Sequence, residues 1–166
     1  MTEKVHYLIK PIAEADLDSV LEVYRQCEDF LALGPQPHAS MEMVVTDLEL
    51  SRAEGGIFSG IWNLSDTMIG IVDFVPKMYE GNPKHAFLSL LMIAKRYRGR
   101  GIGAEVVAAV EQEIAKNPAV KVILSAVHTN NLEAIRFWQR MGYCVVSEPE
   151  QQTDGTVTYR LEKLLS

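Results

Sequence analysis

The chain has 166 residues, a length that suits one domain, and 48% of them are apolar, which is enough to bury a substantial core. Its formal net charge of −6 argues against a general grip on nucleic acid through phosphate contacts. No apolar run is long enough to cross a bilayer, and the first residues lack the features of a signal peptide. We therefore expect a single cytoplasmic domain over residues 1–166, with neither nucleic acid nor membrane as a partner.

The two cysteines, Cys27 and Cys144, lie inside segments with periodic apolar residues and show no CxxC spacing. This pattern predicts reduced core residues and no disulfide or metal role. No metal site is expected elsewhere in the chain.

The first half of the chain is predicted to contain two helices between strands. Apolar residues recur at helical spacing from Leu17 to Tyr24, and Ser40 can cap a second helix. The segment between them, Leu31–Ser40, carries one glycine and two prolines and is predicted to be an irregular loop. The strands expected in this half are Val5–Lys10, Gly56–Trp62, Met68–Val75 and His85–Ile93.

The second half alternates helices and strands before a terminal hairpin. The predicted elements are a helix at Gly103–Lys116, a strand at Ala119–His128, a helix at Asn131–Met141, and strands at Tyr143–Ser147 and Thr156–Glu162. A strand–helix–strand order requires a crossover and favours parallel pairing in the middle of the sheet. We expect a mixed α/β fold, with a central mixed sheet of about seven strands and helices on both faces.

The turn after the strand His85–Ile93 is unusually rich in glycine and arginine. Its sequence, RYRGRGIG, leads directly into a helix, where several backbone N–H groups have no intrahelical partner and the helix dipole is positive. Glycines allow a bulky anion to approach these amides, and arginines add charge-assisted contacts. The spacing fails the dinucleotide fingerprint and the nucleotide P-loop. The turn therefore predicts a phosphate site of another kind, or else a tight turn with solvated arginines.

Two motifs resemble those of the GNAT superfamily of acyl-CoA N-acetyltransferases. The first is Arg98-x-x-Gly101-x-Gly103, which follows an apolar strand and enters a helix, as the family's pyrophosphate loop does. The second is Asn131-x-x-Ala134-x-x-Phe137-Trp138-x-x-x-Gly142-Tyr143, which is similar to a helix motif of the same family. The order of elements also fits the family, so the resemblance extends over the whole chain.

The resemblance implies a binding site for acetyl-CoA as cosubstrate. It implies that the fourth and fifth strands diverge into a V-shaped opening and that the pantetheine arm enters there, in contact with Asn131; a simple helix cap is the alternative role of Asn131. Phe137 is expected at the wall of the cleft. The backbone expected to pair with pantetheine is that of Leu91, Met92 and Ile93, and the residues expected around the pyrophosphate are Arg98, Gly99, Arg100, Gly101, Ile102, Gly103 and Ala104.

The implied activity is transfer of an acetyl group to a primary amine of a small molecule or peptide, by direct attack in a ternary complex. The family's usual acid for the departing thiolate is a tyrosine at the position of Trp138, and indole has no acid function near neutral pH. The candidates for handling the amine proton are Asp73, an acid within an apolar strand, and Ser89, which could hold a water. The alternative for Asp73 is a side chain that points to solvent or pairs with an arginine.

Two other interpretations stay open at this stage. A regulatory module that binds acyl-CoA without turning it over would also explain the missing tyrosine. Alternatively, the turn binds a different phosphate ligand. The expected assembly is a monomer or a homodimer.

Overall fold

A computed structural model describes residues 7–166, so the predicted Val5 and His6 of the first strand lie outside the described residues. The first half forms β1 (Tyr7–Pro11), α1 (Leu17–Gln26), α2 (Glu28–Leu31), α3 (Met41–Ala53), β2 (Ile57–Asn63), β3 (Met68–Val75) and β4 (His85–Ile93). The second half forms α4 (Ile102–Ala115), β5 (Val122–His128), α5 (Leu132–Arg140), β6 (Cys144–Val145), β7 (Glu150–Gln151) and β8 (Val157–Leu164). Every predicted helix and strand within the described residues is present.

The strands form one mixed sheet in the order β1-β2-β3-β4-β5-β8-β6, with the short β7 also paired to β8. The β4–β5 pair is parallel, as the crossover through α4 predicts, and the other pairs are antiparallel. The sheet has eight strands. The expected count was about seven, because the two-residue β7 is too short to leave a periodic pattern.

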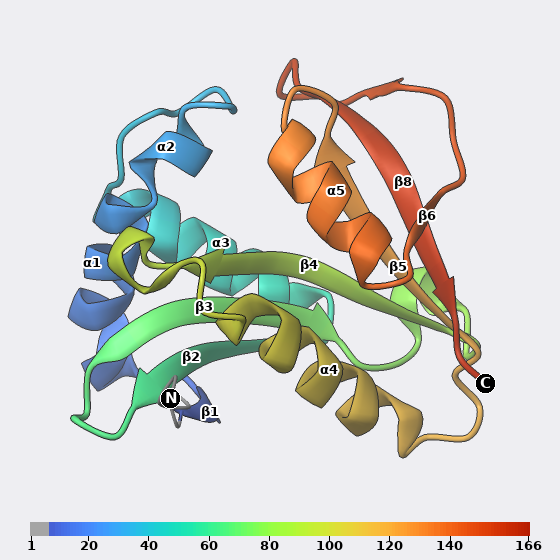
Figure 1. The fold of residues 1–166 in the computed structure, drawn as a ribbon, viewed down its shortest axis with the longest axis horizontal. Coiled ribbons are helices and arrows are strands. Elements are labelled where there is room, and N and C mark those ends of the chain that lie inside the picture. The colour runs from blue at the N-terminus through green and yellow to red at the C-terminus, as the bar shows by residue number, and fades with distance from the viewer. Residues whose placement is uncertain (1–6) are drawn as a thin grey trace.

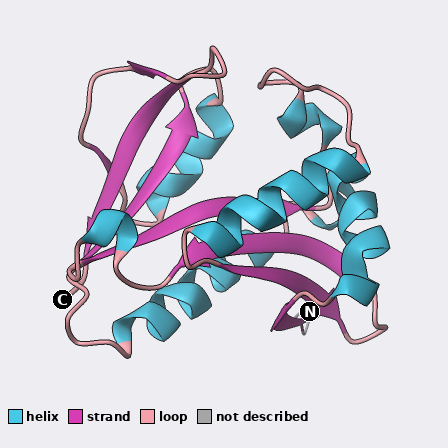
Figure 2. Cartoon of the chain, turned by 180° about the vertical axis from the view of Figure 1, so that it is seen from behind, coloured by secondary structure: helices cyan, strands magenta, loops and turns pink. Residues whose placement is uncertain are grey.

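Helices cover both faces of this sheet, as predicted (Figure 1). On one face α1 and α3 bury a core that includes Val23, Val44 and Ile71. On the other face α4 and α5 bury a second core around Val107, Ile123 and Trp138. Seen from behind, the sheet runs between the two layers of helices (Figure 2). The fold is therefore the mixed α/β architecture expected from the sequence.

The sheet opens between β4 and β5 because β4 carries one extra residue. The two strands pair only from His85↔Val122 to Leu88↔Ser125. The β3–β4 register shifts at the next position, so that Ser89 is left as a bulge between two paired residues. A bulge bends its strand and increases the local twist. Beyond it β4 follows β3 while β5 follows β8, which makes the predicted V-shaped opening (Figure 1).

The prediction for the cysteines is half wrong. Cys27 is fully buried and is a free thiol, as expected. Cys144 is also a free thiol but is exposed, and it lies in β6, the last strand at one edge of the sheet. The apolar spacing around Cys144 indicated burial because the sequence does not reveal which strand lies at an edge.

Within residues 7–166, no helix combines the length and the apolar character that a membrane span requires.

Candidate functional site

The glycine-arginine turn lies at the amino terminus of α4 and leaves backbone amides free. Gly99 and Gly101 have positive φ angles of 75° and 79°, and a Cβ at either position would meet no other atom within 4 Å. These two glycines are therefore required by the backbone angle and not by crowding. The Glu105 amide, which donates to the Gly101 carbonyl at 3.1 Å, starts the helical hydrogen bonds. The amides that precede it in this first turn can reach an anion from the exposed side.

The third glycine of the motif has another purpose. A Cβ on Gly103 would lie 3.6 Å from the ring of Phe137, so the start of α4 packs directly against α5. Phe137 in turn contacts Trp138 edge to face, with ring centroids 5.2 Å apart. The start of α4 and α5 thus lie in contact, which places the two family-like motifs side by side.

Arg98 anchors the turn to the opposite side of the opening. Its guanidinium binds the Asp29 carboxylate of α2 through two nitrogens, at 2.5 and 3.1 Å, and its Nε donates to the Ile93 carbonyl at 2.8 Å. The Arg98 hydrogen bond is the main reason why the pKa of Asp29 lies below its ordinary value. The Arg98 amide is also occupied, since it donates to the Lys95 carbonyl at 3.3 Å. In the structure Arg98 therefore shapes the turn.

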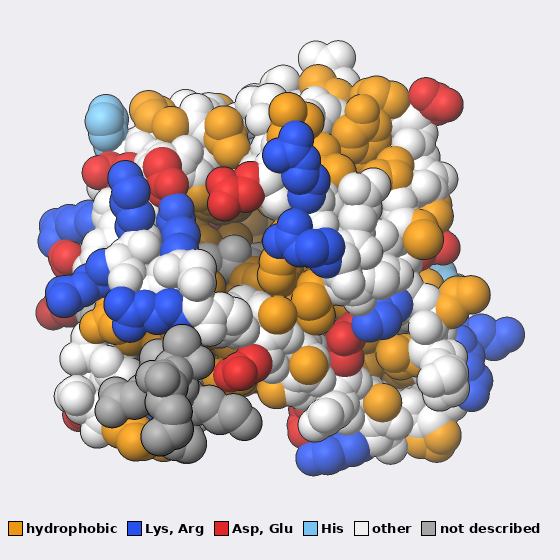
Figure 3. Space-filling view, in the orientation of Figure 1, with side chains coloured by type: hydrophobic (Ala, Val, Ile, Leu, Met, Phe, Trp, Pro, Cys, Tyr) orange, Lys and Arg blue, Asp and Glu red, His pale blue; other side chains and the backbone are white. Residues whose placement is uncertain are grey.

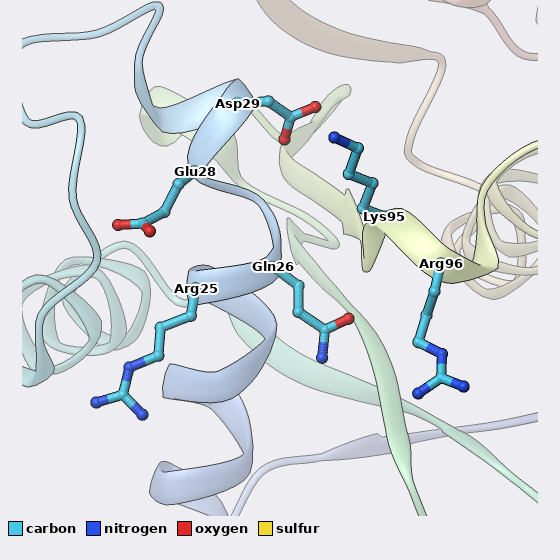
Figure 4. Close-up of a pocket in the computed structure, with 6 residues that line it drawn as sticks. All are labelled: Arg25, Gln26, Glu28, Asp29, Lys95 and Arg96. Carbon is cyan, nitrogen blue, oxygen red and sulfur yellow. The ribbon is translucent and has the colours of Figure 1, made fainter.

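A pocket of about 460 Å³ lies beside this anchor, where α1 and α2 meet the turn after β4. Asp29 and Lys95 point toward one another across it (Figure 4). The space-filling view shows a hollow on this side of the molecule, with apolar side chains in its depth and basic side chains on both sides (Figure 3). The pocket is lined by Arg25, Gln26, Glu28, Asp29, Lys95 and Arg96.

The far end of β4 presents free backbone groups to the opening. The Ala94 amide bonds to Ile69 of β3, and the Met92 carbonyl approaches Gly70 of the same strand. Because the direction of backbone groups alternates along a strand, Leu91 and Ile93 turn their N–H and C=O groups away from β3, toward the opening. The Ile93 carbonyl is already taken by Arg98. The groups left for a ligand are those of Leu91 and the Ile93 amide.

Asn131 caps α5, which was the alternative role considered for it. Its side-chain oxygen accepts from the Ala134 amide at 3.1 Å. Trp138, at the position of the family's tyrosine, is 7% exposed and lies within the aromatic core of α5. The nearby Tyr143 is 1% exposed, and its hydroxyl donates to Glu111 at 3.0 Å. The Tyr143 hydroxyl is therefore engaged within the fold, and the indole of Trp138 has no acid function near neutral pH.

Asp73 and Ser89 are close in space but differ in access. Asp73 is buried at 7% exposure, and its carboxylate accepts a hydrogen bond of 2.6 Å from Ser51 of α3. Burial raises the pKa of Asp73 above its ordinary value, so the alternative of a solvent-facing or arginine-paired side chain is wrong. Ser89 is exposed at the bulge and donates to the Asp73 backbone carbonyl at 3.0 Å. Of the two side chains, only that of Ser89 is therefore accessible.

The buried carboxylate yields a prediction for stability against pH. A folded-state pKa above the unfolded value means that the stability contributed by Asp73 is present at acid pH and declines as pH rises through the folded pKa. The variant Asp73→Asn keeps an oxygen that can accept from Ser51 and removes the buried charge. We expect Asp73→Asn to be more stable than the native chain at pH 7, with the difference shrinking toward pH 4. Urea unfolding at both pH values measures this, and a less stable variant at pH 7 would contradict it.

Three features of the site were not predicted. Asp29, the partner of Arg98, lies in the four-residue α2, which is too short to leave a periodic signal. Ser51 lies in α3, and the helix pattern marks it as facing the core without revealing its partner. The third is the contact of α2 with the end of β5, where the Phe30 and His128 rings stack with centroids 6.3 Å apart. The one sequence feature that could have indicated this contact is the position of His128 at the end of a strand that is apolar on both faces.

Comparison with known proteins finds acetyltransferases. The family model "Acetyltransferase (GNAT) family" matches residues 17–143. An N-alpha-acetyltransferase 30 from Schizosaccharomyces pombe is 29% identical over 80 residues, which are 48% of this chain and 53% of that protein. A spermine/spermidine N(1)-acetyltransferase from Bacillus subtilis is 30% identical over 91 residues, which are 54% of this chain and 55% of that protein. The matches span about half the length of these curated relatives.

Solved structures agree on the fold. An acetyltransferase from Thermus thermophilus superimposes with a TM-score of 0.78 at 23% identity, over 96% of this chain and 97% of that one. A spermidine N-acetyltransferase from Vibrio cholerae, in complex with CoA and spermine, gives 0.74 at 12% identity over 95% of each chain. With a family model that covers most of the sequence and a sheet that opens where that resemblance requires, the chain belongs to the GNAT family of acetyltransferases.

Proposed function

We propose that this protein is an N-acetyltransferase that moves an acetyl group from acetyl-CoA to a primary amine of a small molecule or peptide. The observation that carries the proposal is the opening between β4 and β5, which starts at the Ser89 bulge and ends beside the free amides of the α4 turn. The end of the opening beside the α4 turn suits a pyrophosphate. Along the opening, β4 presents backbone groups that are not paired with another strand. Membership of the GNAT family supports the same activity.

The residues of the site fit acetyl-CoA in three respects. The amides from Gly99 to Ala104 take the pyrophosphate, with Arg98 holding their turn in shape and Arg100 beside it. The free backbone groups of Leu91 and the Ile93 amide pair with the pantetheine arm as an added strand, while Met92 keeps its bonds to β3. Asn131 and Phe137 border the arm from α5. The thioester supplies the electrophilic acetyl group, so no nucleophile of the protein is required.

The acceptor amine enters from the side of the α2–α3 loop, residues 31–40, which reaches across the opening. Asn130, in the turn between β5 and α5, donates to the Leu33 carbonyl at 3.4 Å, so this loop also contacts the β5 side of the opening. The relatives are acetyltransferases for spermine or spermidine and for N-alpha amines, and both groups are primary amines. These relatives therefore support a primary amine as the acceptor and do not distinguish a polyamine from a peptide.

Proton removal matters most for strongly basic acceptors. A lysine-like amine with a pKa near 10.4 is neutral in roughly one molecule in 2,500 at pH 7, whereas a peptide α-amine with a pKa near 8 is neutral in about one in ten. Of the two groups proposed from the sequence, Ser89 is exposed and can hold a water. Asp73 is directed to Ser51, so its role in proton transfer is tested by the pH profile of Asp73→Asn.

The test of the proposal is release of CoA thiol from acetyl-CoA across a panel of spermidine, spermine, lysine and short peptides with free amino termini. We expect turnover with at least one amine and none without an acceptor, and mass spectrometry should find the acceptor heavier by one acetyl group. Tight CoA binding with no turnover on any amine would favour a second function, a regulatory module that binds acyl-CoA. The observation that favours this second function is the buried Trp138, which stands where the family usually has a tyrosine.

A further inference from the structure

His128 is the one titratable side chain on the two backbone segments that line the opening. These segments are Ser89–Ile93 of β4 and Ala126–His128 of β5, the parts of the two strands that lie beyond their last mutual pair. Both segments lie within the described residues, and their other side chains are a serine, an alanine and aliphatic or thioether groups. Any group on these arms that exchanges protons near neutral pH must therefore be this imidazole.

The ring is held in a fixed position at the mouth of the opening. Side chains alternate along β5, so His128 shares a face with the exposed Ala126, while Val127 is buried on the face of α5. Phe30 of α2 stacks almost parallel to the imidazole, with an interplanar angle of 8°. A Cβ on Gly34 of the α2–α3 loop would lie only 3.8 Å from His128 Cε1. The imidazole thus lies where the loop reaches the β5 arm.

One ring nitrogen of His128 lacks a partner. Its Nδ1 is buried, and no hydrogen-bond donor or acceptor of the described chain lies within range. Buried polar groups in folded proteins almost always have a partner, because an unsatisfied one costs about 1–3 kcal/mol. This unmet hydrogen bond lies at the same end of the opening as the loop that flanks the proposed acceptor site. Because Nδ1 itself is enclosed, a substrate amine would reach the imidazole through its other nitrogen, Nε2, which is not among the buried unpartnered atoms of the described chain.

We propose that His128 is the general base of the acetyl transfer, an inference that rests on the proposed acetyltransferase function. The acceptor ammonium gives one proton to the imidazole, which becomes imidazolium. The neutral amine nitrogen then forms a bond to the acetyl carbon as the carbon–sulfur bond breaks. The second nitrogen proton passes to the departing thiolate, which leaves as CoA thiol, and the imidazolium returns its proton to water. Atoms and charges balance without any further reactant.

The groups around His128 suit this role. Phe30, Gly34 and the paired Thr158 of β8 are uncharged. The charged group within electrostatic reach is Asp154 of the β7–β8 turn, whose pKa is lowered mainly by Thr156 and in smaller part by His128.

The decisive experiment compares the dependence of kcat/KM on pH for the native chain, His128→Gln and the control His85→Gln. His85 is an imidazole at the paired start of β4, far along the strand from the opening. With spermidine or another responsive amine, we expect His128→Gln to lose roughly 100-fold in kcat/KM at pH 7. The deficit should shrink to a few-fold near pH 10, where the amine is already neutral. His85→Gln should follow the native curve throughout.

Two further measurements separate a chemical role from a structural one. Imidazole in the buffer should restore part of the activity of His128→Ala, and both His128 variants should bind CoA with native affinity. In NMR spectra of the native chain with CoA, a non-acetylatable analogue of the responsive amine should shift the His128 ring signals and leave those of His85 in place.

The possible failures are distinguishable. If the native chain acetylates amines but His128→Gln keeps the native pH profile, or if the analogue leaves the His128 ring signals unmoved, His128 is not the base, whereas the acetyltransferase function stands. If the native chain turns over no amine at all, the proposed function fails and this inference fails with it.

Discussion

Gly101→Val should weaken CoA binding about 100-fold while the fold is retained. Gly101 has a φ of 79° at the start of α4, and its Cα faces open space. A branched side chain there would stand in front of the free amides and keep a pyrophosphate from reaching them. Two charge-assisted bonds of about 1.5 kcal/mol each would be lost, and 1.4 kcal/mol corresponds to a tenfold change in affinity. Isothermal titration calorimetry with CoA measures the result.

The matched control for this variant is Gly155→Val. Gly155 lies at the tip of the β7–β8 turn with a φ of 88°, and a Cβ there also meets nothing within 4 Å. Both variants carry the same kind of backbone strain, roughly 1–2 kcal/mol for a residue with a side chain in the left-handed region. Their melting temperatures should therefore fall by similar amounts, whereas only Gly101→Val should lose affinity. Equal CoA affinity in the two variants would remove the turn as the pyrophosphate site.

Glu111→Ala should lower the free energy of unfolding by about 3 kcal/mol, since it removes one partner of a largely buried ion pair. Glu111 of α4 accepts from the Tyr143 hydroxyl at 3.0 Å and from Lys163 Nζ of β8 at 3.1 Å. Burial, and to a smaller extent Glu111, raises the pKa of Tyr143, so its hydroxyl stays neutral and donates. In a domain of this size the melting temperature should fall by roughly 6–12 °C, measured by calorimetry.

Glu113→Ala is the control on the same helix. Glu113 forms an exposed bridge of 2.7 Å to Lys116, three residues away, and such surface pairs contribute about 0–1 kcal/mol. Its melting temperature should therefore stay within a few degrees of the native value. If Glu111→Ala behaves like Glu113→Ala, the cluster of Glu111, Tyr143 and Lys163 does not hold the β8 arm of the sheet against α4.

The sequence was most informative where a local pattern decides the structure. Ser40 caps α3 as predicted, with its hydroxyl accepting from the Met43 amide at 3.1 Å. The glycines of the turn indicated a special backbone conformation, because few residues other than glycine adopt a positive φ. The sequence was least informative about pairs far apart along the chain. Asp29 and Arg98, 69 residues apart, carry no local sign that they meet.

The same distinction explains the candidate site. The glycine-rich turn follows from local pattern, whereas the free strand backbone was expected from the family resemblance. The choice among proton-handling groups depends instead on which side chains face the opening, and that depends on the bulge in β4 and on how α2 approaches β5. Two of the contacts that decide it, Ser51 to Asp73 and Phe30 to His128, join elements whose packing angles the sequence does not reveal.

The opening begins where β4 has one residue more than its partner strand β3. Asp73 pairs with Leu90 while its neighbour Phe74 pairs with Leu88, so β4 contains one residue more than β3 over the same paired length. The bulge, a feature of the backbone, marks the point where the pairing of β4 with β5 ends. The side chains that face the gap are therefore free to differ among proteins with this architecture without closing it, so that one frame can accommodate acceptors of different shape.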